Sequence, residues 1–391
     1  MIEVVNLEEL CTGIIDCPHS TPKWQDKGIP VIRNYNLKDG KIDCANLSFV
    51  SEEDYKERVK RAIPEESDII ISREAPMGVV GIVPKGFQCC LGQRLVLLKI
   101  DKSRCLPKYL LYTLMSEYVQ LQIRRINQTG SIVSNLNISS LRELKIPLHS
   151  FEEQEKITNI LSAIDDKISL NSQINQELEA MAKTLYDYWF VQFDFPDQNG
   201  KPYKSSGGKM VYHPELKREI PEGWGVEKLS HFLTIKNGKD HKHLQDGKFA
   251  VYGSGGIMRT VADYLYSGES ILFPRKGTLN NVMYVNEKFW TVDTMFYSEV
   301  NKNTSALYVF YSVKDIDFNK LNTGTGVPSM TSSILYDLNI VVPEENILEK
   351  FNTVVKRNYE TIKLNNIQNQ ELTQLRDWLL PMLMNGQVKV E

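Results

Sequence analysis

The chain has 391 residues, of which 42% are hydrophobic and 24% charged, and its formal net charge is −3 at pH 7. This composition is typical of a globular protein with two to three domains. It excludes a membrane-embedded protein, because no window reaches the roughly 18 apolar residues that a membrane-spanning helix needs. The N-terminus lacks the pattern of a signal peptide, so we expect a cytoplasmic protein.

Neither the cysteines nor the total charge points to a ligand. The six cysteines lie in the first third of the chain without a C-x-x-C pair, which predicts buried or free thiols rather than a zinc site. Residues 149–200 carry a net charge of −7 and residues 343–391 carry −1. The segments 1–148 and 201–342 are therefore mildly basic, at +2 and +3, and the local field at a docking surface is what matters for a nucleic-acid ligand.

In chain order, residues 1–148 predict an α/β (α+β) domain. Its short apolar runs at 68–72, 79–83 and 94–100 are bounded by Gly, Pro and polar residues, which is typical of strands.

Residues 152–188 predict a long helix. Apolar residues recur at steps of three and four, as along the a/d seam of a coiled coil, and Asn171 and Asn175 interrupt this seam. A polar residue at such a position lowers stability but fixes register and partner.

The segment 196–210 is rich in Gly, Ser, Pro and Lys and reads as a linker. A second domain follows over 201–342, with predicted strands at 270–273, 281–285 and 306–313. A second long helix lies within 343–391, and its seam is interrupted at Asn365 and Asn369.

These elements form an internal repeat. The string "NQEL" occurs at 175–178 and again at 369–372, and a shift of 194 residues pairs both helical segments without a gap. A shift of 202 pairs Arg73 with Arg275. We therefore expect two related domains and two helices that pair with each other. The alternative is that each helix packs only on its own domain, and the sequence leaves the relative direction of the helices open.

Motifs of catalysis are missing. The chain has no Rossmann glycine fingerprint, P-loop or G-x-S-x-G elbow, and no "NPPY"-like segment of adenine methyltransferases. A nuclease-like PD…ExK spacing begins at Pro196-Asp197, but it lies in the predicted linker. The "HKH" at 241–243 is read as a basic loop rather than a metal site.

Polar and basic loops recur at similar places in both domains. Arg, Asn and Gln can read base edges, Ser and Thr can bind phosphates, and aromatic rings can stack on bases. The candidate DNA-binding residues are Lys23, Trp24, Arg33, Asn34, Arg73, Gln93, Arg94, Thr129 and Ser131 in the first domain, and Lys239, His241, Lys242, Tyr252, Ser254, Arg275, Thr294, Thr323 and Thr325 in the second.

Three segments resemble the specificity subunits of type I restriction–modification systems, and the resemblance covers essentially the whole chain. The helix at 150–195 is similar to that family's central helix, and 200–229 is similar to the bridge into its second target recognition domain. "NTGTGVPSM" at 322–330 resembles the turn that closes a recognition domain. Its counterpart at 127–136 departs from that pattern, with Ile132 for Gly326 and Ser134 for Pro328.

The resemblance implies two recognition domains, 1–148 and 201–342, each reading one half of a bipartite double-stranded DNA target. It implies that the helices in 149–200 and 343–391 run antiparallel as a spacer and dock two modification subunits, with restriction subunits added to the complex. No catalysis, cofactor or metal is then expected in this chain. S-adenosylmethionine, ATP and Mg²⁺ belong to the partners.

Three alternatives remain. They are a methyltransferase or nuclease in its own right, a coiled-coil scaffold that binds only protein, and the recognition subunit of a related multi-subunit methylase-nuclease.

Overall fold

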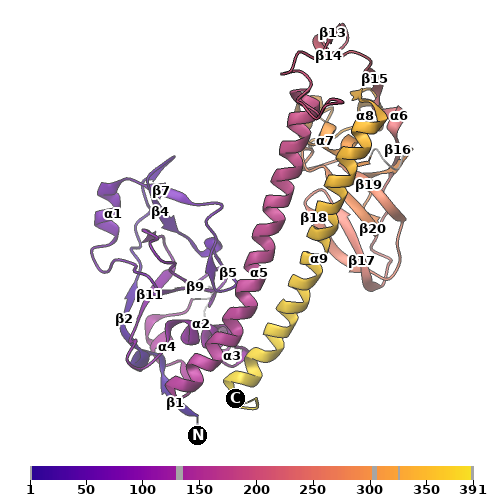
Figure 1. The fold of residues 1–391 in the computed structure, drawn as a ribbon. Helices are drawn as coiled ribbons and strands as arrows, with labels where there is room; N and C mark the ends of the chain where they lie inside the picture. The colour runs from indigo at the N-terminus through magenta and orange to yellow at the C-terminus, as the bar shows by residue number, and fades with distance from the viewer. Residues whose placement is uncertain (1, 129–134, 302–305, 325, 389–391) are drawn as a thin grey trace. The chain divides into compact units, whose positions relative to one another are not determined.

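The chain divides into two compact units. The computed structural model describes residues 2–128, 135–301, 306–324 and 326–388. The first unit comprises residues 1–171 and 367–391, and the second comprises 172–366 (Figure 1). Each contains one globular domain and one half of each long helix, α5 (Phe151–Tyr186) and α9 (Glu345–Met384). None of the described helices is long and apolar enough to cross a membrane.

The first domain is built on an antiparallel sheet in the order β2-β11-β8-β9. Its strands are β2 (Cys11–Asp16), β11 (Leu95–Ile100), β8 (Ile69–Ser72) and β9 (Val80–Ile82). The predictions of strands at 68–72, 79–83 and 94–100 are therefore confirmed. β8 is buried along its whole length, which explains its unbroken apolar run.

Smaller elements complete the first domain. A second sheet has the order β10-β4-β7-β3, and β1 pairs with β12. The bounds are β10 (Cys90–Leu91), β4 (Ile29–Ile32), β7 (Ser48–Val50), β3 (Trp24–Gln25), β1 (Glu3–Asn6), β12 (Lys145–Leu148), β5 (Leu37–Lys38) and β6 (Lys41–Ile42). The helices are α1 (Glu52–Arg58), α2 (Pro107–Met115), α3 (Glu117–Gln128) and α4 (Ile138–Arg142), with 3-10 turns η1 (Leu7–Leu10) and η2 (Asn34–Asn36).

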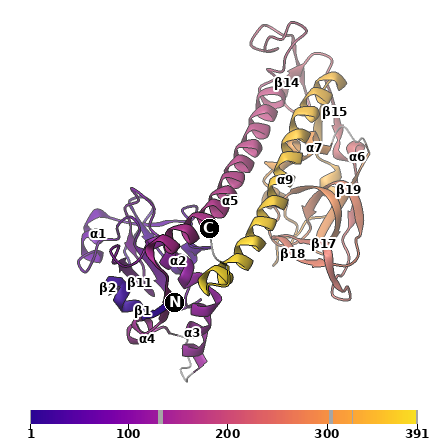
Figure 2. The same ribbon diagram turned by 60° about the horizontal axis from the view of Figure 1, so that its bottom comes forward.

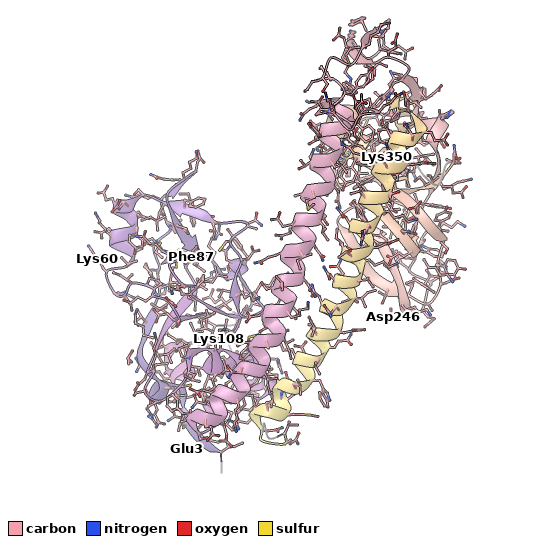
Figure 3. The ribbon with its side chains drawn as sticks, viewed as in Figure 1. Glu3, Lys60, Phe87, Lys108, Asp246 and Lys350 are labelled. Atoms are coloured by element: carbon pink, nitrogen blue, oxygen red, sulfur yellow. The ribbon has the colours of Figure 1, made fainter. Side chains whose placement is uncertain are left out.

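The second domain has a six-stranded sheet in the order β16-β21-β19-β20-β17-β18. Its strands are β16 (Leu233–Asn237), β21 (Met295–Val300), β19 (Tyr266–Pro274), β20 (Met283–Thr291), β17 (Asp246–Gly253) and β18 (Gly256–Val261). Outside it lie the pairs β13 (Met210–His213) with β14 (Arg218–Pro221) and β15 (Gly225–Lys228) with β22 (Asn339–Val342), and the helices α6 (Leu229–Phe232), α7 (Ala306–Lys314) and α8 (Ser332–Tyr336). Asp246 and Lys350, labelled in Figure 3, mark the start of β17 and the first turns of α9.

The prediction of a strand at 306–313 is wrong, because this segment forms α7. Seven of its nine residues are apolar or aromatic, and all seven are buried. A short run that is buried on all sides has no periodicity to separate a helix from a strand. Within α7, the Tyr308 hydroxyl donates to the Val341 carbonyl at 2.6 Å and ties the helix to β22.

The two domains share one plan. The order β2-β11-β8-β9 of the first domain is repeated as β16-β21-β19-β20 in the second. Hydrogen bonds recur at matched positions: the Leu7 amide donates to the Leu144 carbonyl at 2.9 Å, and the Leu229 amide donates to the Leu338 carbonyl at 2.8 Å. The internal repeat predicted from the sequence is therefore a repeat of structure.

Halves of the two long helices run antiparallel within each unit, where they lie side by side (Figures 1 and 2). In the first unit, the Asn171 amide donates to the Asn369 side-chain oxygen at 2.9 Å. In the second, Asn175 and Asn365 are joined at 2.8 Å. The direction that the sequence left open is thus antiparallel, and the helices pair with each other while also burying residues such as Leu161 and Phe351 in the domain cores.

Candidate nucleic-acid interface

A set of backbone hydrogen bonds gathers loops at one edge of each domain. In the first unit, the Arg73 amide donates to the Arg94 carbonyl at 2.8 Å, and the Leu136 amide donates to the Arg73 carbonyl at 3.0 Å. In the second, the Arg275 amide donates to the Thr294 carbonyl at 2.8 Å, and the Met330 amide donates to the Arg275 carbonyl at 2.9 Å. We call this arrangement the backbone node. It brings together the same three chain segments in both copies.

We call the surrounding surface the loop edge. In the first unit it consists of 33–36, 73–76 and 92–94, and in the second of 253–256, 275–279, 292–294, 322–324 and 326–329. Apart from the segment between Leu321 and Ser332, which connects η5 (Phe318–Leu321) to α8, each segment follows or precedes a β-strand, so the fold places strand ends and their polar loops together. Loops held on such a scaffold are where binding residues usually lie.

The first loop edge contains five of the predicted residues, Arg33, Asn34, Arg73, Gln93 and Arg94. Asn34 Nδ2 donates to the Ala75 carbonyl at 2.6 Å. Gln93 Nε2 donates to the His19 carbonyl at 2.6 Å. Arg94 Nε lies 3.1 Å from a Glu74 carboxylate oxygen, while about half of the Arg94 side chain remains exposed. The predicted residue Lys23 is exposed as well.

Arg73 has a structural role that the sequence did not reveal. Its Nη1 donates to both oxygens of Asp16, at 2.8 and 2.9 Å, and its Nε donates to the Leu136 carbonyl at 3.0 Å. Its Nη2 donates to Asn135 at 3.2 Å, and only 12% of the side chain is exposed. The guanidinium therefore cross-links the loops, and its bonding leaves little of it for a ligand.

Arg275, the repeat counterpart, has the opposite surroundings. Its side chain is exposed, and its guanidinium carbon lies 5.8 Å from the centre of the Phe296 ring. Within the part of the chain that the structure describes, it has no carboxylate partner. The position that matches Asp16 is Asn237, which cannot supply the charge that holds Arg73.

In the second loop edge, hydrogen bonds fix the described residues 322–324 and 326–329. Asn322 Oδ1 accepts from the amides of Gly324 and Ser329, both at 2.8 Å. The Gly277 amide donates to the Pro328 carbonyl at 3.0 Å, which ties the turn to the node. Asn322 was not among the candidate DNA-binding residues, although an Asn side chain commonly accepts from a backbone amide two residues further on and so marks a turn. Thr323 is exposed on this turn.

Tyr252 is a core residue rather than a stacking platform. It is buried beside Phe289, and its hydroxyl donates to a Glu287 oxygen at 2.7 Å. Burial, and then the neighbouring Glu287, raises the pKa of the Tyr252 phenol far above its usual value, so it stays protonated. The prediction of an exposed aromatic at this position is not supported by its geometry.

Of the remaining second-unit candidates, Ser254 and Thr294 lie in the second loop edge, and the Lys239 amide donates to the Thr291 carbonyl beside it at 2.9 Å. Lys239 and Lys242 are exposed, His241, Ser254 and Thr294 are partly buried, and the Ser254 carbonyl accepts from Asn281 Nδ2 at 2.8 Å. Thr129, Ser131 and Thr325 lie outside the described residues.

Left-handed backbone also clusters at the loop edges. Ala75 has φ 46° and Arg94 has φ 67° in the first unit. Gly277, the repeat counterpart of Ala75, has φ 93°. Non-glycine residues in this region carry strain, and such strain is often found at binding sites.

The structure assembles no metal centre from its described residues. No group of three or more His, Cys, Asp or Glu side chains is placed to hold an ion. Asp197 of the PD…ExK spacing instead accepts hydrogen bonds from the amides of Asn199 and Lys201, both at 2.8 Å, and so closes a turn.

A duplicated α/β domain with polar loops gathered at one edge, carried on long antiparallel helices, defines a class of paired recognition modules. The family model described as type I restriction modification DNA specificity domain matches residues 2–180 and 221–374. The chain therefore belongs to the family of type I restriction–modification specificity proteins.

Individual relatives of the chain belong to the same family. The type I restriction enzyme MjaIX specificity subunit of Methanocaldococcus jannaschii is 30% identical over 388 residues, covering 89% of this chain and 86% of the relative. The HindI specificity subunit of Haemophilus influenzae is 22% identical over 358 residues, covering 72% and 78%. The crystal structure of the S subunit of a type I system from M. genitalium shares the fold, with a TM-score of 0.61, 18% identity and coverage of 98% and 96%.

Proposed function

We propose that this chain is the DNA-recognition subunit of a type I restriction–modification complex and that each loop edge reads one half of a bipartite target. The backbone node carries the proposal. Main-chain hydrogen bonds hold the same three segments together in both domains, while the side chains mounted on them differ. Two similar scaffolds with different loops are suited to two different half-sequences.

The contacts of each side chain divide the candidates by role. Arg33, Gln93 and Arg94 in the first unit and Lys239, Lys242, Arg275 and Thr323 in the second are wholly or partly exposed and can reach DNA. Arg73 and Tyr252 position the loops from within. In this proposal the two recognition domains are residues 1–148 and 201–342, and the segments that contain the long helices are residues 149–200 and 343–391.

The helices α5 and α9 serve as the spacer and as the docking surface for two modification subunits. Support comes from large apolar side chains exposed on them: Leu375 and Trp378 in the first unit and Met181 and Leu364 in the second, each between 43% and 67% exposed. Exposed apolar residues on a helix are typical of protein interfaces, and Trp is the residue most enriched at their energetic centres.

Catalysis belongs to the partners in this proposal. Modification subunits bind S-adenosylmethionine and methylate adenine, restriction subunits use ATP and Mg²⁺, and the present chain needs no cofactor. The related methylase-nuclease assembly remains a second candidate, distinguished by which subunits co-purify with the chain.

Sequencing of methylated adenines in cells that express the complex tests the proposal. We expect one bipartite motif with a fixed gap. Replacement of 1–148 by the matching domain of another specificity subunit should change one half of the motif and leave the other half and the gap unaltered. A change in both halves, or DNA affinity that does not fall steeply with salt, would contradict the proposal.

A further inference from the structure

Among the described residues of the first unit, Arg33 is the one arginine that lies over aromatic rings. Its guanidinium carbon lies 5.2 Å from the centre of the Trp24 ring and 4.8 Å from the centre of the Tyr35 ring. Both rings are about half exposed, at 44% and 50%. Cation–π contacts of this kind hold a guanidinium in place without neutralising its charge.

No carboxylate among the described residues pairs with the Arg33 guanidinium. Among the described residues, Arg73 is paired with Asp16 and Arg94 with Glu74, whereas the Arg33 guanidinium has no carboxylate partner. Within the described ranges of the chain, its one side-chain hydrogen bond runs from Nη1 to the Tyr35 hydroxyl, at 3.3 Å. A guanidinium has five N–H donors, so four have no partner among these residues, including the parallel pair formed by Nε–H and one Nη2–H.

The backbone beneath Arg33 is fixed. The Arg33 amide donates to Asn36 Oδ1 at 3.0 Å. Asn36 is 1% exposed, and its Nδ2 donates to the carbonyls of Asp43 at 3.2 Å and Asn46 at 3.1 Å. This buried amide holds the η2 turn in one conformation.

The side-chain stem and its aromatic neighbour are also fixed. A Cβ added to Gly92 would lie 3.3 Å from Arg33 Cγ, so the stem passes directly against the glycine backbone. The Tyr35 hydroxyl has a further contact with Ser48 Oγ at 3.4 Å. Little conformational freedom is therefore lost when the guanidinium engages a ligand.

A rigid, unneutralised fork with a free pair of parallel donors matches one base edge in the major groove. Guanine presents two acceptors there, O6 and N7, in the spacing that arginine donors meet. Adenine presents one acceptor and one donor on the same edge, and a phosphate needs no fixed orientation. Resting on the DNA-recognition role proposed above, we infer that Arg33 reads a guanine in the half-site of the first domain.

The second domain has no arginine at the position that matches Arg33. The Gly92 amide donates to the Ile32 carbonyl at 2.7 Å, and the Val292 amide donates to the Tyr252 carbonyl at 3.1 Å, which aligns the residue after Ile32 with the residue after Tyr252. That residue is Arg33 in the first domain and Gly253 in the second. This position can therefore supply a guanine contact in one half of the target only.

The test uses the complex of the chain with its modification subunits. The motif is first read from methylated adenines, and duplexes are then made with each base pair of both halves replaced in turn. Affinities are measured at one salt concentration for the wild type, Arg33→Ala, Arg33→Lys and Arg125→Ala. Arg125 is an exposed arginine on α3, so its variant is a control with the same change in charge.

We expect replacement of one G·C pair in the first half to weaken wild-type binding about 5- to 150-fold. Arg33→Ala should abolish that discrimination and leave discrimination in the second half unchanged, which also shows that the variant is folded. Arg33→Lys should not restore it, because an ammonium lacks the planar fork. Arg125→Ala should discriminate as the wild type does.

Two results would overturn the inference. One is that Arg33→Ala discriminates like the wild type. The other is that Arg33→Ala weakens binding to all duplexes equally and reduces the slope of log affinity against log salt concentration by about 1, as the loss of one phosphate contact would. Failure of the wild-type complex to prefer any sequence would instead refute the proposed function itself.

Discussion

The ion pair between Asp165 of α5 and Arg376 of α9 should be a large contributor to the stability of the first unit. Arg376 Nη1 lies 3.0 Å from Asp165 Oδ1, and the two side chains are 10% and 13% exposed. The Tyr112 hydroxyl donates to the other Asp165 oxygen at 2.7 Å. Burial, and then Asp165, raises the pKa of the Tyr112 phenol well above its usual range, so it remains a donor at neutral pH.

Arg376→Ala would leave the Asp165 carboxylate buried without its cation. Removing one partner of a buried pair costs about 3–5 kcal/mol. For a unit of about 200 residues, each 1 kcal/mol shifts the melting temperature by about 2–4 °C, so we expect a loss of about 6–20 °C. Scanning calorimetry of the full chain measures this shift.

The second unit supplies a matched rescue. The repeat places Tyr311, Tyr359 and Ala182 where the first unit has Tyr112, Asp165 and Arg376, and the Tyr311 and Tyr359 hydroxyls lie 3.4 Å apart. Asp165→Tyr combined with Arg376→Ala transplants this arrangement, which has no buried charge. The double variant should recover at least half of the loss seen with Arg376→Ala. Two results would refute the reasoning. One is a melting temperature for Arg376→Ala within 2 °C of the wild type, and the other is a loss of melting temperature in the double variant equal to the sum of the losses in the two single variants.

Three further outcomes follow from individual contacts. Arg73→Met should lower the melting temperature by about 6–12 °C, because the change leaves Asp16 without its arginine partner. Arg275→Met should leave the melting temperature unchanged, but it should weaken DNA binding and make the salt dependence of binding shallower. Equal effects of the two changes would contradict the assigned roles. Tyr252→Phe should destabilise the chain by about 1 kcal/mol in calorimetry without altering DNA affinity, and a loss of affinity would restore Tyr252 as a DNA contact. Thiol labelling of the folded chain at pH 8 should modify Cys44 fastest, because Cys44 is exposed whereas Cys11 is partly buried and the other four cysteines are buried. Burial raises the pKa of every one of these thiols, to about 12 for Cys11, Cys89 and Cys105 and to about 11 for Cys90, and burial and then Asp43 raise that of Cys44. The Cys44 rate should rise with pH, and Cys44→Ser should abolish the fast phase.

Much of the architecture was predictable because it rests on periodicity and repetition. The a/d spacing over 152–188 and its copy located both long helices, and the shift of 194 residues identified the duplication. The run at 306–313 was misassigned because an element buried on all sides has no polar face to give it a period.

The site was less predictable, since the role of a polar residue depends on partners that are distant in the sequence. Arg73 and Arg275 are equivalent by sequence, yet one is neutralised by Asp16 and the other is exposed. Asp16 lies 57 positions from Arg73, and nothing in its local sequence marks the pairing. The same holds for Tyr252, whose burial depends on strands that are assembled from separate segments.

The backbone node explains how one scaffold can carry two different reading surfaces. Its hydrogen bonds join main-chain amides and carbonyls, which every residue except proline supplies, so they do not depend on the side chains at the loop edge. An arginine at the centre of the node can therefore brace the loops in one domain and face outward in the other without moving the strand ends. The replacement of Arg33 by Gly253 across the repeat follows the same logic, because the hydrogen bond beside it, from Gly92 or Val292, is retained. Changes in recognition in this fold should thus need few compensating changes in the core.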